Sequence, residues 1–154
     1  MKLKELLEDK DMKMKLLAKK LNVAVSEIER DGNEFTIGDK DYLVYTKREA
    51  TKEAIDNVVD TMHETGLEAF SKSFKKEILN IKYAKPNKKR EVKELLAYYD
   101  EEPDYVEETL QKGYMDLEKI AALVVKKDGL GNILSSYDGK SINLGSGLTA
   151  YRNN

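Results

Sequence analysis

The chain has 154 residues, of which 40% are apolar and 36% charged, and its formal net charge is −2. It contains no cysteine, which excludes disulfides, cysteine nucleophiles and metal centres held by thiolates. His63 is the only histidine, so a metal site with two histidines from one chain is excluded as well. The length is that of one ordinary domain, and we predict a single domain over residues 1–154.

The N-terminal segment has the spacing of helices. Apolar residues recur at intervals of three and four from Leu3 to Leu21, which predicts helices over residues 2–10 and 12–21. Asp11 either caps the second helix or lies inside one long helix. Over residues 34–46, apolar and polar residues alternate around Gly38, and this pattern predicts a β-hairpin. The second strand of that hairpin is apolar on both faces, so we expect cover on both sides.

A capping box begins the most clearly marked helix. Thr46 is followed three residues later by Glu49, the spacing at which a hydroxyl and a carboxylate satisfy each other's backbone amides. The apolar stripe that follows runs to Ile81 with Gly66 as an interruption, which predicts one kinked helix or two helices end to end. Pro86 closes this region.

Further helices are expected over residues 91–99, over 105–112 and after Asp116. From Asp128 onward glycine becomes frequent and charge scarce, and we predict a C-terminal β-hairpin near residues 132–151. Its strands would cover residues 133–137 and 142–144, with a last strand over 148–151. We expect this sheet to pair with the hairpin near residues 34–46 or to lie beside it. The predicted fold class is therefore α+β, with a mostly helical body and two hairpins.

Charge is strongly segregated in the second half of the chain. Residues 72–93 carry nine basic and two acidic side chains, whereas residues 94–118 carry one basic and nine acidic side chains. The two blocks either neutralise each other within the fold or face partners. The basic candidates for partner contact are Lys82, Lys85, Lys88, Lys89 and Arg90. The acidic candidates are Asp100, Glu101, Glu102, Asp104, Glu107 and Glu108.

Two segments keep nucleic-acid binding open as an alternative. The basic segment 72–93 places lysines around Tyr83, as sequence-independent nucleic-acid grooves do, although lysine grips phosphate less firmly than arginine. Segment 12–30 has the spacing of a helix-turn-helix, with Ala18 where two helices would touch and Ile28 as an apolar anchor. Its second helix would carry Glu27 toward DNA, and that charge repels phosphate.

Signatures of catalysis are scarce. Gly139-Lys140-Ser141 matches the end of a phosphate-binding P-loop, but the motif requires glycine at position 134, where this chain has Leu134. The motif also requires a following helix, whereas residues 142–144 predict a strand. Acidic pairs such as Glu101-Glu102 leave a small metal-dependent hydrolase as a second alternative, although carboxylates are too abundant here to identify an acid and a base. We expect no catalytic residue, no metal site and no cofactor.

A family resemblance rests on two parts of the chain. They are the region of the first hairpin with the helix after it, and the C-terminal tail: Phe35–Gly38, Asp41–Thr46, Glu49–Ala50, Leu67–Phe70, Asp128–Gly139 and Tyr151–Asn154. This pattern resembles small uncharacterised proteins encoded by tailed phages and prophages, over less than half of the chain. The resemblance implies a phage or prophage origin and work in the bacterial host cytoplasm, and it transfers no activity.

Together these observations favour a non-enzymatic accessory protein of a phage or prophage that binds and modulates a host or phage macromolecule. Inhibition of a host defence enzyme or of a nucleic-acid-processing enzyme is one such role. The expected partner is a host or phage protein, because segregated charge steers encounters between macromolecules, and nucleic acid is the alternative partner. No apolar run is long enough to cross a bilayer, so we expect no membrane association.

Overall fold

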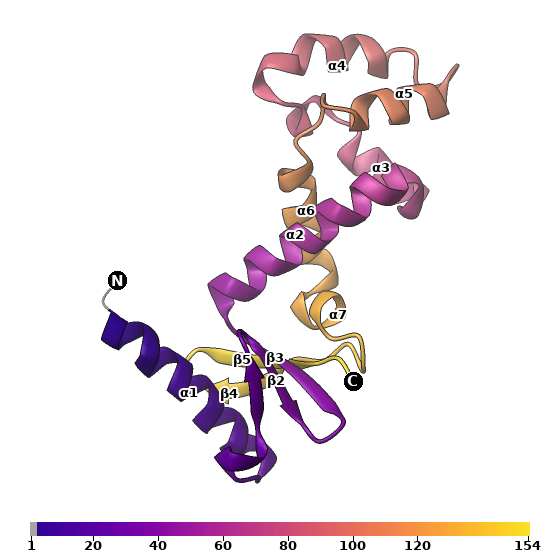
Figure 1. Cartoon of the computed structure of the whole chain (residues 1–154). Coiled ribbons are helices and arrows are strands. Elements are labelled where there is room, and N and C mark those ends of the chain that lie inside the picture. Colours follow the sequence, from indigo (N-terminus) through magenta and orange to yellow (C-terminus); the bar gives the residue numbers. More distant parts are fainter. Residues whose placement is uncertain (1–2) are drawn as a thin grey trace. The chain divides into compact units, whose positions relative to one another are not determined.

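The computed structural model describes the backbone of residues 3–154 and the side chains from residue 12 onward (Figure 1). Over these residues the chain forms seven α-helices and one five-stranded antiparallel sheet, which confirms the predicted α+β class. The chain divides into two compact units. The sheet unit comprises residues up to Ala54 together with Asp128–Asn154, and the helical unit comprises Ile55–Lys127. The single domain stays a prediction.

The sheet unit is built from both ends of the chain. Its strands follow the order β1-β2-β3-β5-β4, and every neighbouring pair is antiparallel. Its elements are α1 (Leu3–Leu21), β1 (Glu29–Asp31), β2 (Glu34–Ile37), β3 (Lys40–Thr46), α7 (Leu130–Leu134), β4 (Ile142–Gly145) and β5 (Leu148–Arg152), with the start of α2 (Lys47–Thr65). The register places Val44 opposite Ala150, so the first hairpin and the C-terminal strands form one sheet, which is one of the two arrangements that the sequence left open.

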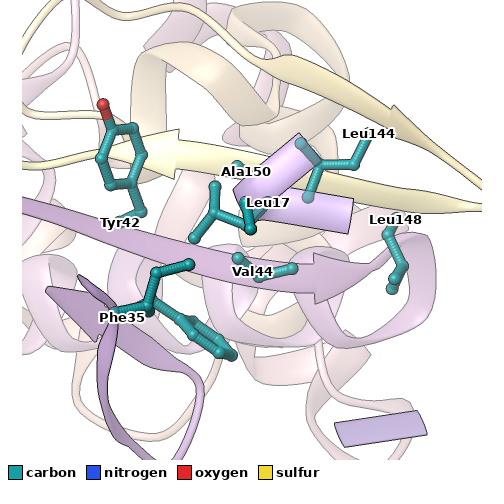
Figure 2. Close-up of a cluster of buried hydrophobic side chains, with 9 residues drawn as sticks. Leu17, Phe35, Tyr42, Val44, Leu144, Leu148 and Ala150 are labelled. Atoms are coloured by element: carbon teal, nitrogen blue, oxygen red, sulfur yellow. The ribbon is translucent and has the colours of Figure 1, made fainter. Parts of the chain in front are cut away.

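One face of this sheet packs against α1. Leu17, which is fully buried, lies on the sheet with Phe35, Val44 and Ala150 in a single apolar cluster (Figure 2). Because side chains alternate along a strand, Tyr45 points to the opposite face, where it is also buried. The predicted cover on both sides of β3 is therefore present.

The C-terminal hairpin differs in one respect from the prediction. Residues 133–137 do not form a strand, because the chain makes the short helix α7 over Leu130–Leu134 and then turns. Ser135 is buried there, and its hydroxyl donates to the carbonyl oxygen of Arg152 at 2.7 Å. That bond holds the turn beside β5, so the partner of β4 is β5 rather than the segment before it.

The helix-turn-helix prediction for segment 12–30 is wrong. Asn22 adopts a positive φ of 55° and ends α1, and only a 3₁₀ turn over Val25–Glu27 follows. The Glu27 carboxylate accepts a hydrogen bond from the amide of Ala24 at 3.0 Å, which closes the turn. The chain then enters β1, which pairs with β2, so no second helix exists to enter a DNA groove.

The helical unit contains the remainder of α2 and four further helices. The predicted long stripe is two helices end to end, because Gly66 (φ 65°) follows α2 and a 3₁₀ turn over Gly66–Ala69 separates α2 from α3. Gln111 fixes this junction by donating from Nε2 to the carbonyl oxygen of Met62 at 2.5 Å. The helices are α3 (Lys72–Ile78), α4 (Lys89–Leu96), α5 (Pro103–Gln111) and α6 (Leu117–Asp128).

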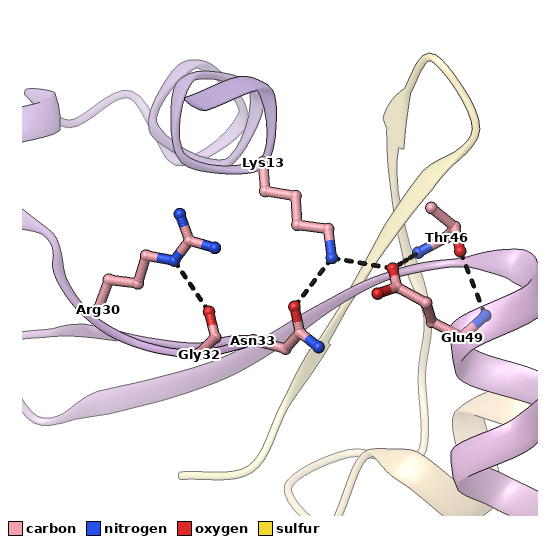
Figure 3. A network of polar contacts seen from close by, with 6 residues as sticks. All are labelled: Lys13, Arg30, Gly32, Asn33, Thr46 and Glu49. Carbon is pink, nitrogen blue, oxygen red and sulfur yellow. Dashed lines mark hydrogen bonds and ion pairs between the residues drawn. The ribbon is translucent and has the colours of Figure 1, made fainter. Parts of the chain in front are cut away.

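A polar network ties α1 to the start of α2 within the sheet unit. Lys13 is 5% exposed, and its Nζ donates to Asn33 Oδ1 at 2.9 Å and to Glu49 Oε1 at 2.8 Å (Figure 3). Glu49 Oε1 also accepts from the amide of Thr46, and the Glu49 amide donates to Thr46 Oγ1, which confirms the capping box. Glu49 therefore serves as both a helix cap and the counter-ion of a buried lysine.

The free energy of unfolding should depend on the ionisation of Glu49. Burial acts to raise the pKa of Glu49, but hydrogen bonds from Lys13 and Thr46 and the charge of Lys13 outweigh it, so the pKa is lowered from 4.5. A carboxyl with a lowered folded-state pKa contributes stability above its unfolded pKa and loses it as the pH falls. Glu49→Gln should cost roughly 1 kcal/mol at neutral pH, since the carboxylate is 39% exposed and solvent screens the pair.

Urea denaturation at pH 7 and in steps below about pH 4.5 measures this effect. The advantage of the natural chain over Glu49→Gln should shrink as the pH falls. Glu29→Gln, at an exposed position of β1, is the matched control and should show a difference near zero throughout. An advantage of the natural chain that grows with acidity would contradict the assignment.

Candidate partner-binding surfaces of the helical unit

The basic candidates lie in and next to a short segment around Ala84 that pairs, antiparallel, with the segment around Met115. The amide of Lys85 donates to the carbonyl oxygen of Tyr114 at 2.9 Å, and the amide of Asp116 donates to that of Tyr83 at 2.8 Å. This pairing holds the segment that begins at Lys82 against the start of α6. The side chains of Lys82, Lys85, Lys89 and Arg90 are exposed and that of Lys88 is half-buried.

Three lysine ammonium groups lie over the rings of two tyrosines. The Nζ atoms of Lys82 and Lys119 lie 5.5 and 5.9 Å from the centroid of the Tyr83 ring, and Lys88 Nζ lies 5.5 Å from that of Tyr114. The basic surface therefore consists of Lys82, Lys85, Lys88, Lys89, Arg90 and Lys119. Sequence reasoning missed Lys119, because it stands outside the basic block and reaches it only through the pairing of the two segments.

Tyr83 is not available to stack on bases. It is 6% exposed, and two lysines lie over its ring. A sequence-independent groove for single strands needs exposed aromatic faces. The basic surface thus offers positive charge without the stacking platform that the sequence suggested.

The two charge blocks neutralise each other only in part. Lys75 Nζ lies 3.1 Å from Glu107 Oε1, and both side chains are largely buried. Arg90 Nε lies 3.6 Å from Glu94 Oε1 on the surface, at helical spacing. Among the side chains of residues 12–154, no carboxylate lies within 4.0 Å of the ammonium groups of the other members of the basic surface.

Glu107 differs from the other acidic candidates because it points inward. It is 8% exposed, and Oε1 also accepts a hydrogen bond from the hydroxyl of Tyr99 at 2.9 Å. Burial raises the pKa of Tyr99, and the hydrogen bond to Glu107 and its charge raise it further. Its position was readable in the sequence, since Glu107 shares the buried stripe of α5 with Val106 and Leu110. Glu107 is thus an internal counter-ion rather than a partner contact.

The remaining acids gather around the turn between α4 and α5, together with two exposed tyrosines. The amides of Glu101 and Glu102 donate to the carbonyl oxygen of Tyr98 at 3.1 and 3.0 Å and close the turn. The side chains of Tyr98 and Tyr105 are 60% and 61% exposed. We define the acidic–tyrosine surface as Tyr98, Asp100, Glu101, Glu102, Asp104 and Tyr105. Charge alone could not indicate the two tyrosines, and Tyr98 lies in the turn after α4.

The carboxylates of this surface lack cationic neighbours. Among the described side chains, no lysine or arginine nitrogen lies within 4.0 Å of Asp100, Glu101, Glu102 or Asp104. Glu108, the last acidic candidate, pairs with Lys112 at 2.7 Å on the exposed side of α5. The hydrogen bond from Lys112 and its charge lower the pKa of Glu108.

Among residues 12–154, no three side chains of histidine, aspartate or glutamate converge as metal ligands, and His63 is exposed on α2. Within residues 3–154, no helix has both the length and the apolar character that a bilayer span requires.

Comparison with known proteins identifies no family for this chain. No protein-family model matches the chain, no curated protein matches it, and no solved structure matches it. The surfaces of the helical unit and the sheet unit therefore have to be interpreted from their own residues.

Proposed function

We propose that the protein is a non-enzymatic binding protein that docks its acidic–tyrosine surface on a basic surface of a partner protein and thereby modulates it. The observation that carries this proposal is the pair Tyr98 and Tyr105, each about three-fifths exposed, in a segment whose four carboxylates have no ion-pair partner among the described side chains. Tyrosine is enriched among the residues that dominate binding energy in protein interfaces. Unpaired carboxylates speed the encounter with a positively charged partner.

The backbone of this surface supports docking without large rearrangement. The two hydrogen bonds to the carbonyl oxygen of Tyr98 fix the turn, and Pro103 stands at the first position of α5, where its fixed φ suits the start of a helix. A turn that is ordered before binding loses less conformational entropy on association. The surface is therefore suited to rigid recognition.

The origin and location of the protein belong to the same proposal. The resemblance of the first hairpin and the C-terminal tail to phage-encoded proteins supports a phage or prophage accessory protein that works in the bacterial host cytoplasm. A host defence enzyme or a nucleic-acid-processing enzyme is then a suitable partner. Enzymes that hold nucleic acid carry basic surfaces, which match the charge of the acidic–tyrosine surface.

Nucleic-acid binding by the basic surface is the second candidate function. It is favoured by the lack, among the described side chains, of any carboxylate within 4.0 Å of the Nζ atoms of Lys82, Lys85 and Lys89. It is weakened by the burial of Tyr83 and by the preference for lysine over arginine. Any such binding would rest on phosphate contacts and would decline steeply with salt.

The decisive experiment is capture of a partner from lysate of infected host cells, with the full chain as bait. We expect one partner in stoichiometric amount, and Tyr98→Ala with Tyr105→Ala should weaken its binding by about tenfold to a hundredfold, because two anchor side chains are lost. Tyr137→Ala is the matched control, since Tyr137 is 55% exposed in the sheet unit, and it should leave binding unchanged.

Two results would overturn the proposal. The first is a captured partner whose affinity does not change when both tyrosines are removed. The second is binding of DNA or RNA at about 50 mM salt that disappears in Lys85→Gln with Lys89→Gln, because phosphate contacts are strongest at low salt. That second result would establish the basic surface as the functional one.

A further inference from the structure

The sheet unit contains a cavity that the proposed function does not use. Its volume is about 880 Å³, and it is open to solvent. Four segments line it: the first residue of α2, residues 128–132, residues 139–141 and the hairpin of β4 and β5. Sites for small molecules generally have volumes of about 300–1,000 Å³, so this cavity has the capacity of a ligand site.

Close backbone packing shapes one wall of the cavity. A Cβ atom added to Gly131 would lie 2.6 Å from the carbonyl oxygen of Gly139, and one added to Gly139 would lie 2.9 Å from Asn132 Oδ1. Only residues without side chains permit this approach. At Gly131 the wall therefore brings α7 against the backbone of residues 139–141, and the side chain of Asn132 lies close to Gly139.

The charge of the lining favours an anion. Lys47 and Lys140 contribute two positive charges and Asp128 one negative charge. Among the side chains of residues 12–154, no carboxylate lies within 4.0 Å of either lysine Nζ. Asp138, beside the cavity, accepts a hydrogen bond from the amide of Lys140 at 2.9 Å, and the charge of Lys140 helps to lower its pKa. Both ammonium groups are thus available to a ligand.

Neutral donors complete the lining. Ser141, Thr149 and Tyr151, whose side chains carry hydroxyls, are among the lining residues. Tyr151 is 2% exposed and burial raises its pKa, so its hydroxyl stays protonated and able to donate. Asp128 adds one acceptor for a hydroxyl of the ligand.

We infer that this cavity binds a small phosphate monoester, with Lys47 and Lys140 as counter-ions of the phosphate and Ser141 as a hydroxyl donor to it. A phosphate monoester carries nearly two negative charges at neutral pH. It therefore matches the charges of the two lysines better than a ligand with one carboxylate would. Lysine is a common phosphate ligand that acts as a point charge. The cavity is far larger than inorganic phosphate, so a sugar or nucleoside attached to the phosphate would fill it.

The inferred site is not a P-loop, although it contains Gly139-Lys140-Ser141. A P-loop leads from a strand into a helix, whereas this segment follows α7 and leads into β4. The two ammonium groups also come from opposite parts of the chain, since Lys47 stands directly after β3. The sequence could not reveal this juxtaposition, because it depends on the pairing of β3 with β5.

Titration of the full chain with adenosine monophosphate and with ribose phosphate tests the inference. Adenosine, ribose and inorganic phosphate serve as comparison probes, and calorimetry and amide chemical shifts are the measurements. We expect saturable binding of at least one monoester with a dissociation constant below about 1 mM, and weaker binding of inorganic phosphate. Shifted amides should lie in residues 128–132 and 139–141, and the choice between the two monoesters distinguishes a nucleotide from a sugar phosphate.

Variants make the test specific. Lys47→Met and Lys140→Met should each weaken binding by at least about tenfold, because each removes one counter-ion. Lys40→Met, at an exposed lysine of the same unit outside the cavity, should leave binding unchanged. Lys47 is exposed, so its variant keeps the test valid even where Lys140→Met alters folding.

Several outcomes would overturn the inference. They are the lack of saturable binding by both monoesters, an equal affinity for inorganic phosphate, and an equal loss of affinity in Lys40→Met. Amide shifts confined to residues 82–90 would also overturn it, since they would place the anion on the basic surface of the helical unit. None of these outcomes bears on capture of a partner protein through Tyr98 and Tyr105.

Discussion

Glu107→Ala is expected to lower the free energy of unfolding of the helical unit by about 3 kcal/mol. The substitution leaves Lys75 without its counter-ion and removes the acceptor of the Tyr99 hydroxyl. Breaking one partner out of a buried ion pair generally costs about 3–5 kcal/mol, because the remaining charge stays buried and unpaired. The lower end applies here, since the side chain of Lys75 is 18% exposed. Urea denaturation followed by circular dichroism measures the change.

Glu108→Ala is the matched control for this prediction. Glu108 is the next residue on α5, and its pair with Lys112 is exposed, with side-chain exposures of 64% and 69%. Exposed pairs contribute little to stability because solvent screens them, so the control should unfold close to the natural chain. Equal losses in the two variants would show that Glu107 does not act as an internal counter-ion.

Gly131→Ala is expected to destabilise the sheet unit by about 2–3 kcal/mol. The new Cβ would lie 2.6 Å from the carbonyl oxygen of Gly139 and 3.1 Å from the amide nitrogen of Ser141. Both neighbours are backbone atoms, so no rotation of a flexible side chain can relieve the contact, and overpacking of this kind costs about 1–3 kcal/mol. Thermal or urea unfolding of the variant measures the loss.

Gly32→Ala separates this steric effect from backbone strain. Gly32 has a φ of 63°, but nothing lies within 4 Å of an added Cβ. Alanine there should cost about 1–2 kcal/mol through the left-handed conformation alone. A Gly131→Ala variant more stable than Gly32→Ala would mean that the two segments can move apart.

Local signals in the sequence were sufficient for much of the fold. The capping box at Thr46 and Glu49 forms as predicted, because both groups lie within four residues and need no distant partner. The hairpin of β2 and β3 follows from alternation around Gly38 in the same way. Where one short segment carries the whole signal, its structure could be predicted.

The predictions that were wrong concern segments whose structure depends on contacts with distant parts of the chain. Residues 133–137 have a strand-like apolar pattern, but the bond from Ser135 to Arg152 and the packing of Gly131 favour a short helix and a turn. The helix-turn-helix spacing of segment 12–30 failed because β2 is available as a pairing partner for β1. Neither partner can be identified from the segment itself.

The candidate partner-contact residues were likewise predictable only in part. Of the candidates that charge segregation indicated, Lys85 and Asp100 are exposed. Charge alone could not separate Glu107 from Glu108, because only the buried stripe of α5 distinguishes an internal acid from an external one. The cavity of the sheet unit was missed entirely, since it joins Lys47 to Lys140 across the sheet.

The order of strands has a consequence for biosynthesis. β5 lies between β3 and β4, yet it is the last strand to leave the ribosome, long after β3 has emerged. Until then β3 presents an unpaired edge, which is the feature that invites association between nascent chains. Closure of the sheet over such a long stretch of sequence also carries an entropic penalty and slows folding. Early collapse of the intervening helices would shorten that search, so translation itself favours completion of the helical unit before the sheet.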